Sequence, residues 1–312
     1  MNKTITLSTS LACLLILASC GDSAVEFDAP PSAALIASGE VEVIQEDLVR
    51  YHVLNFGNRV TAAIVESETD TIVIDVAFGL IPNSGTELRA YVDAIGKPVS
   101  VIITHGHQDH YGNMDQFADA TVYAETANAA FLMADDNFTG LYDGTVNGVS
   151  GSVMIGGLEF VFDNVTGTEA SENGYIYLPE HGALFTGDLT FNRAHAYIRE
   201  YTPLDDNDEL DTWLAALESM KVRFGSYNHI IMGHTGRRAD VIATLDENIA
   251  YISDAQGLIN GSRDLTSGGA ATSVQDVVDE LGILYPDYEP GGLVLALPDG
   301  FFPGDPGAVW FE

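Results

Sequence analysis

The sequence has few basic residues for its length. Lys and Arg together number 12 against 46 Asp and Glu in 312 residues, a formal net charge of −34 at pH 7. Such a surface repels the phosphates of nucleic acids and anionic lipid headgroups, so we expect neither as a partner. The acidic excess keeps the chain soluble, and it gives no information about the charge of a substrate.

Cysteine is also scarce. The only two cysteines are Cys13 and Cys20, both at the N-terminal end of the sequence. The remaining chain therefore has no thiol for a disulfide, a thiolate metal ligand or a cysteine nucleophile. This excludes thiolate zinc sites and thiol hydrolases.

The first 20 residues are typical of an export signal. Lys3 precedes the apolar stretch Ile5–Leu17, which is too short to span a bilayer stably. The run Leu17-Ala18-Ser19-Cys20 resembles the lipobox of bacterial lipoproteins, and the alternative is an ordinary signal peptide with a chance cysteine. The resemblance implies that Cys20 is acylated and becomes the first mature residue. With Gly21 rather than Asp next, it implies an outer-membrane anchor, with the protein facing the periplasm and touching the membrane through its lipid alone.

A hydrophobic content of 46% provides enough apolar material for one large α/β core. We expect a Pro- and Ala-rich tether over residues 21–38 and one folded domain over residues 39–312. Short runs of β-branched residues indicate strands at 41–45, 49–54, 59–67, 71–77, 99–106, 152–157, 158–164, 174–180, 182–188 and 229–234. Helices are predicted at 86–96, 113–119, 124–133, 208–222, 237–259 and 273–281, and residues 134–152 form a Gly-, Asp- and Asn-rich stretch. Strands followed by helices in each half predict an αββα sandwich of two mixed sheets with outer helices.

A histidine-rich motif follows the apolar run Val99–Ile103. Its residues are Thr104-His105-Gly106-His107-Gln108-Asp109-His110, with histidines at i, i+2 and i+5 and a carboxylate at i+4. This spacing differs from the i, i+4 pair of a helical zinc site and suits a loop that turns its side chains around metal. The motif also lies at the carboxyl end of a predicted strand, where open α/β sheets bind ligands.

The motif His105-x-His107-x-Asp109-His110 resembles the HxHxDH signature of the metallo-β-lactamase superfamily. The resemblance extends over about residues 41–240. Three further segments resemble motifs of this superfamily. Ile72-Val73-Ile74-Asp75 resembles the strand end whose Asp braces the metal loop, and Phe185-Thr186-Gly187-Asp188 resembles the motif with the bridging carboxylate. Ile231-Met232-Gly233-His234 resembles the late strand with the last His ligand.

One position departs from the superfamily pattern. Most members have a His ligand about nineteen residues before the bridging Asp, but this chain has Glu169 there, in Gly167-Thr168-Glu169-Ala170. The Thr-Glu-Ala run resembles the alkyl sulfatase branch, in which this Glu is a ligand. The rest of that branch's signature is missing, because Ser171 replaces a Pro and Asp188 replaces a Glu. A solvated Glu169 on a turn is the alternative.

The resemblance implies two metal sites that share Asp188. One metal would be held by His105, His107 and Glu169, and the other by Asp109, His110 and His234. A water bridging two such ions becomes a hydroxide near neutral pH, and Asp109 can orient it and accept a proton. Imidazole and carboxylate ligands favour two Zn²⁺, with Fe or Mn as alternatives.

The segment after Asp188 often lines the substrate pocket in this fold. Arg193, His195 and Tyr197 are therefore candidates to polarise a substrate carbonyl or bind a carboxylate, with plain packing as the alternative. The other histidines, His52, His181 and His229, lack partners at metal spacing and are interpreted as structural.

The resemblance implies a metal-dependent hydrolase that cleaves an ester, lactone, thioester or amide-type bond in a small molecule. A β-lactamase and a sulfatase are hydrolytic alternatives, although the Asp at position 188 argues against the first, since β-lactamases of this superfamily generally carry Cys or Ser there. An iron-dependent oxidoreductase and a non-catalytic binding lipoprotein are alternatives of other classes.

The lipid anchor predicts the behaviour of one variant. Cys20→Ser removes the only acylation site of the lipobox-like run, so the protein should leave the membrane fraction or retain its leader. Cell fractionation and the intact mass of the protein measure both results. An unchanged membrane fraction and an unchanged mature mass would remove the lipoprotein hypothesis.

Overall fold

The computed structural model describes residues 25–57, 60–198 and 208–289. The predicted leader and Cys20 lie outside the described residues. None of the helices in the described ranges is long and apolar enough to cross a bilayer.

The first sheet has seven strands in the order β1-β2-β3-β4-β5-β6-β7. Its strands are β1 (Gly39–Gln45), β2 (Arg50–Phe56), β3 (Val60–Glu66), β4 (Thr71–Ile74), β5 (Val99–Ile102), β6 (Thr121–Glu125) and β7 (Val146–Val149). Pairing is antiparallel from β1 to β4 and parallel from β4 to β7. The parallel half brings the carboxyl ends of β4, β5 and β6 to one edge.

The second sheet has six strands in the order β13-β12-β11-β10-β9-β8. Its strands are β8 (Gly151–Ile155), β9 (Leu158–Thr166), β10 (Glu172–Leu178), β11 (Ala183–Phe185), β12 (His229–Ile231) and β13 (Arg237–Arg238). Only β11 and β12 are parallel, so their carboxyl ends also lie side by side.

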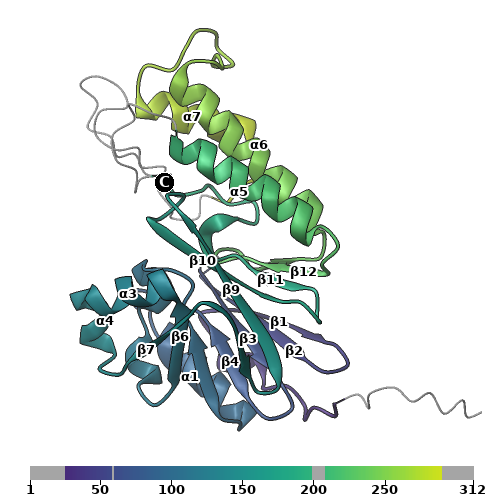
Figure 1. The fold of residues 1–312 in the computed structure, drawn as a ribbon. Coiled ribbons are helices and arrows are strands. Elements are labelled where there is room, and N and C mark those ends of the chain that lie inside the picture. The colour runs from purple at the N-terminus through teal and green to yellow at the C-terminus, as the bar shows by residue number, and fades with distance from the viewer. Residues whose placement is uncertain (1–24, 58–59, 199–207, 290–312) are drawn as a thin grey trace, which may run out of the picture.

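Helices cover the outer faces of both sheets (Figure 1). The first sheet carries α1 (Ser84–Ile95), α3 (Thr126–Ala134) and α4 (Asp136–Leu141), and the second carries α5 (Asp208–Phe224), α6 (Val241–Asn260) and α7 (Val274–Leu284). The remaining short elements are α2 (Gln108–Tyr111) and the 3-10 turns Ala33–Leu35, Met114–Phe117 and Gly187–Leu189. This arrangement confirms the predicted αββα sandwich.

Successive side chains of β10 point alternately into two different apolar layers. Tyr175 and Tyr177 belong to the apolar cluster beneath α5, α6 and α7, whereas Ile176 and Leu178 belong to the cluster between the two sheets. Successive strand side chains point to opposite faces, so a strand with both faces covered must be apolar throughout. Central strands such as β4, with the sequence Thr-Ile-Val-Ile, are near-continuous apolar runs for this reason.

Some predicted elements differ from the structure. The helix predicted over residues 113–119 is the 3-10 turn Met114–Phe117. The helix predicted over residues 124–133 begins at Thr126, because Thr121–Glu125 forms β6, a strand that was not predicted. The stretch 134–152 contains α4 and the edge strand β7, whose sequence Val-Asn-Gly-Val lacks the β-branched run that marks the other strands. Helix α6 begins at Val241 rather than at residue 237, because the Asp240 side chain caps it and the preceding arginines form β13.

Part of the predicted tether packs against the domain. The amide of Val25 donates to the carbonyl of Asp47, Ile36 is buried, and Ser38 bonds to Glu87 on α1. The Phe27 ring lies under the side chains of Arg50 and Lys97. Residues 25–38 of the predicted tether therefore lie against the domain.

Next to Phe27 lies a buried ionic cluster centred on Glu66. Arg50 Nε donates to Glu66 Oε2 at 2.7 Å and Lys97 Nζ to Oε1 at 2.7 Å, while His52 Nε2 lies 3.0 Å from Oε2. His52 also bonds to Tyr91, so it is structural as predicted. Burial alone would raise the pKa of Glu66, but His52, Lys97 and Arg50 lower it to about 2.

The Glu66 cluster predicts a specific loss of stability in acid. The folded pKa of Glu66 is about 2 against an ordinary value of 4.5, so its contribution is complete above pH 4.5 and disappears as the pH falls toward 2. Glu66→Gln should cost about 3–5 kcal/mol at pH 7, because it leaves Arg50 buried without its anionic partner. Denaturant unfolding from pH 7 to pH 3 measures both effects. Equal stability of the two proteins at pH 7 would contradict this account.

Candidate metal centre

The predicted metal motif begins where β5 ends. His105 and His107 lie in the loop that follows Ile102, and His107 is the residue before the single helical turn α2. That turn carries Asp109 and His110, so their side chains leave the chain in a different direction from those of the first two histidines. One seven-residue segment thus contributes to both halves of the site.

The other ligand candidates come from the second sheet. Glu169 lies in the turn between β9 and β10, Asp188 lies in the 3-10 turn after β11, and His234 follows β12. Because β11 and β12 are parallel, Asp188 and His234 emerge at the same edge. The site therefore forms at the seam between the two sheets.

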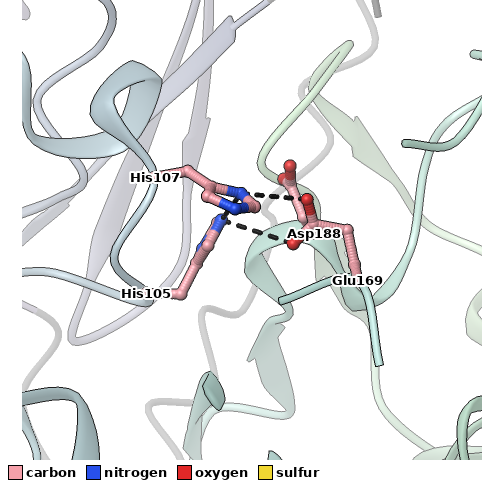
Figure 2. Close-up of side chains that lie close together, drawn as sticks. All are labelled: His105, His107, Glu169 and Asp188. Atoms are coloured by element: carbon pink, nitrogen blue, oxygen red, sulfur yellow. Dashed lines mark hydrogen bonds and ion pairs between the residues drawn. The ribbon is translucent and has the colours of Figure 1, made fainter. Parts of the chain in front are cut away.

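The first group consists of His105, His107, Glu169 and Asp188 (Figure 2). Each offers one ligand atom, and these atoms lie within 4.8 Å of one another. Glu169 Oε1 is 2.9 Å from His107 Nδ1, and Glu169 Oε2 is 3.6 Å from His105 Nε2. Glu169 is buried, which rules out the alternative of a solvated Glu on a turn.

The second group consists of Asp109, His110, Asp188 and His234, with ligand atoms again within 4.8 Å. Asp188 Oδ1 lies 3.3 Å from His110 Nε2, and Oδ2 lies 3.0 Å from His234 Nε2. Asp109 Oδ2 lies 3.3 Å from His234 Nε2. Asp188 belongs to both groups, as a bridging ligand must.

The chemistry of these donors fits metal ions. Glu169 Oε2, Asp188 Oδ1 and His110 Nε2 are buried and make no hydrogen bond within the described part of the chain. Burial raises the pKa of Glu169 to about 7, although His107 opposes the rise. For His234, burial favours a lower pKa, but Asp188 and Asp109 raise it to about 10. Buried carboxylates and imidazoles that lie this close together favour cations between them.

Comparisons with known proteins agree with this geometry. A sequence model of the metallo-beta-lactamase superfamily matches residues 56–225, more than half of the chain. The chain belongs to the metallo-β-lactamase superfamily. The sequence is also 33% identical over 155 residues to hydroxyacylglutathione hydrolase from Rhodobacter capsulatus, a match that covers 49% of this chain and 55% of that protein. The chain thus spans about half the length of this curated relative.

Solved structures of β-lactamases share the fold. A metallo-beta-lactamase from Pontibacter korlensis is 20% identical, with a TM-score of 0.50, over 69% of this chain and 99% of its own. VMB-1 is 18% identical, with a TM-score of 0.53, over 69% of this chain and 98% of its own. At this level of identity the likeness concerns the fold alone. Together with the family match it confirms the metallo-β-lactamase fold predicted from the sequence.

Asp75, at the end of β4, braces the loop that carries the histidine motif, as the resemblance of the Ile72–Asp75 segment implies. Its Oδ1 accepts a hydrogen bond from the Thr104 amide, and its Oδ2 accepts from Thr104 Oγ1 and from His110 Nδ1, each at 2.8 Å. Because a carboxylate only accepts, His110 carries its proton on Nδ1 and presents the Nε2 lone pair to the site.

Gly233 allows the two sheets to close on the site. A Cβ at this position would lie 2.2 Å from Asp188 Oδ1 and 2.6 Å from His110 Cε1. Any side chain there would displace the bridging carboxylate. The residue was part of the predicted Ile231–His234 motif, but only the structure shows why it must be glycine.

The three predicted substrate residues have different surroundings. The Tyr197 ring meets His107 edge-on, with centroids 5.7 Å apart. His195 is buried, bonds to Tyr251 at 3.1 Å, and has its pKa lowered to about 4 by burial. Arg193 is exposed and pairs with Glu247 at 3.5 Å. Tyr197 is thus the member of the three with a described contact to a ligand candidate.

Two cavities adjoin residues next to the ligands. One, of about 310 Å³, is lined by Gln108 of the metal motif and Tyr111 just after it, together with Phe78, Leu80, Asn137 and Leu141. The other, of about 480 Å³, is lined by Thr235, Asn55, Asn192 and Arg193 together with three acidic residues, Glu40, Asp287 and Glu289. Phe78 and Leu80 were not among the predicted site residues, although they follow Asp75 at the carboxyl end of β4, where the same strand-end rule would have placed them.

Asp75 provides a test of the metal centre that leaves its ligands unchanged. Asp75→Asn keeps the shape but presents an amide N–H to His110 Nδ1, which moves the imidazole proton to Nε2 and blocks that ligand atom. We expect about 10–100-fold weaker metal binding through His110, measured by chelator competition with Zn²⁺. Asp93→Asn, in the exposed ion pair with Arg89, is the control. Wild-type affinity in the Asp75 variant would show that this carboxylate does not orient His110.

Proposed function

We propose that this protein is a dinuclear zinc hydrolase that cleaves an ester, thioester, lactone or amide-type bond of a small molecule. The observation that carries the proposal is the sharing of Asp188 by two ligand groups of four residues each. His105, His107 and Glu169 would hold one ion, and Asp109, His110 and His234 the other. Bound there, a pair of divalent ions would supply Lewis acidity and lower the pKa of water toward neutrality.

Asp109 is the residue of the chain best placed to move a proton. Its carboxylate lies 3.3 Å from His234 Nε2, yet its side chain keeps 21% of its surface exposed, whereas that of Asp188 keeps 2%. An acid–base group must reach both the reacting atoms and the departing proton. His107 is also 21% exposed, and the ring of Tyr197 lies against it. A substrate carbonyl would enter there, with Tyr197 as the hydrogen-bond donor to its oxygen.

Thioesters are the first substrates to test. The curated relative is named for hydrolysis of hydroxyacylglutathione, a thioester, and it shares 33% identity over about half of each chain. The bridging position holds Asp188, whereas β-lactamases of this superfamily generally carry Cys or Ser there. We therefore rank β-lactams below thioesters as candidate substrates. A sulfatase activity is the second candidate, because Glu169 contacts His107 where most members of the superfamily have a His.

We also propose that Cys20 anchors the protein to the outer membrane on the periplasmic side. The docked chain begins at Val25, whose amide bonds to Asp47. Five residue steps of at most about 3.6 Å separate it from Cys20, so the domain would lie within about 18 Å of the lipid. Such an enzyme would act on small molecules close to the membrane surface.

The hydrolase proposal predicts metal-dependent turnover that requires Asp109. Purified protein loaded with Zn²⁺ should bind two ions and cleave a member of a thioester, lactone, ester, β-lactam and sulfate ester panel, and a chelator should abolish the activity. Asp109→Asn should lower kcat by about 10²–10⁴-fold through loss of the proton acceptor. Asp115→Asn, an exposed carboxylate on the neighbouring turn, is the matched control. Absence of turnover from protein shown to hold two ions would contradict the proposal.

A further inference from the structure

The turn that presents Glu169 is short and has little support of its own. It joins β9 to β10, which pair at Thr166 and Glu172, and is closed by two backbone hydrogen bonds, from Gly167 to Ser171 and from Thr168 to Ala170. Glu169 is at its tip, with its carboxylate directed at the histidines of the first sheet (Figure 2). A tight turn with a buried charge at its tip needs other contacts to hold it in one position.

Asn173 provides those contacts. Its Nδ2 donates to Thr168 Oγ1 at 2.9 Å and to the Ala170 carbonyl at 3.1 Å, so the two bonds fall on either side of Glu169. The side chain is fully buried, and its two donor hydrogens match the two acceptors. Its amide thus ties both flanks of Glu169 to β10.

The backbone of Asn173 is tied to the other half of the same site. It forms an antiparallel bridge with His105, and the adjacent Gly174 amide donates to the Thr104 carbonyl at 3.1 Å. The approach depends on glycine, because a Cβ on Gly174 would lie 2.4 Å from that carbonyl oxygen. The two sheets are therefore joined at the residue that also holds the Glu169 turn.

We propose that Asn173 is a positioning residue that sets the distance between Glu169 and the histidine pair His105 and His107. Its backbone is fixed to His105 and its side chain to the turn of Glu169. One residue thereby links the carboxylate and imidazole ligands of the first metal, which come from different sheets. The proposal rests on the ligand set given under the proposed function, and it concerns the first metal and not the second.

The test compares the two metal sites within one molecule. Apo-protein is titrated with Co²⁺, followed by visible absorption, and with Zn²⁺ in competition with a chromophoric chelator. Asn173→Ala should weaken one of the two bound ions by about 10-fold or more while the other keeps nearly its wild-type affinity. A purely structural role would lower the midpoint of thermal unfolding without separating the two affinities, so equal weakening of both ions, or of neither, overturns the proposal.

Thr168 supplies a matched pair of milder variants. Thr168→Val removes the hydroxyl acceptor at constant shape and should weaken the same ion by about 2–10-fold, the value of one hydrogen bond. Thr168→Ser keeps the hydroxyl and should bind both ions as the wild type does. If Asn173→Ala does not fold, the two Thr168 variants test the proposal instead. Equal metal affinities of Thr168→Val and Thr168→Ser would then overturn it.

Glu169→Gln separates a failure of this proposal from a failure of the ligand set. In that background Asn173→Ala should add no further loss, because the positioned ligand is gone. If Glu169→Gln loses an ion and Asn173→Ala does not, the ligand set stands and the positioning role is wrong. If Glu169→Gln binds both ions as tightly as the wild type, the ligand set itself is wrong.

Discussion

The structure depends on how the charges at its centre are balanced. Three carboxylates and four imidazoles lie close together where the two apolar sheets meet. Asp188 is the point of contact, since its two oxygens face His110 on one side and His234 on the other. Asp109, Glu169 and Asp188 carry three negative charges, and two divalent cations would bring four positive ones, which leaves a single positive charge for an anion between them. The buried donors are compatible with a stable fold because they are arranged for ions.

The sandwich is suited to this arrangement because each sheet has a parallel portion. Parallel strands end at the same edge, so β4 and β5 deliver Asp75 and the histidine motif together, and β11 and β12 deliver Asp188 and His234. Close approach then depends on positions without side chains, such as Gly174 and Gly233. Apolar layers and ionic contacts such as those around Glu66 stabilise the rest of the fold.

Much of this could be predicted from sequence because the informative signals are local. The motif from His105 to His110 and the apolar strands before each ligand are contiguous, and they indicated the fold and the seven candidates that the structure brings together. Edge strand β7 was missed because its sequence lacks the apolar run of a buried strand. The side-chain bonds of Asn173 and the contact of Tyr197 with His107 were also missed, since they depend on how distant segments approach in space. The packing of residues 25–38 was missed for the same reason. Their composition resembles that of a linker, and the contacts of Phe27 and the burial of Ile36 are seen only in the structure.

The central claim is that Glu169 and Asp188 complete a two-metal centre. X-ray diffraction from crystals of the zinc-loaded protein, with anomalous data collected on both sides of the zinc absorption edge, tests it directly. The account predicts two anomalous peaks about 3.5 Å apart with Asp188 between them. It also predicts a Glu169 oxygen about 2.0–2.2 Å from the ion held by His105 and His107. A single peak, or two peaks with Glu169 turned away from both, would contradict it.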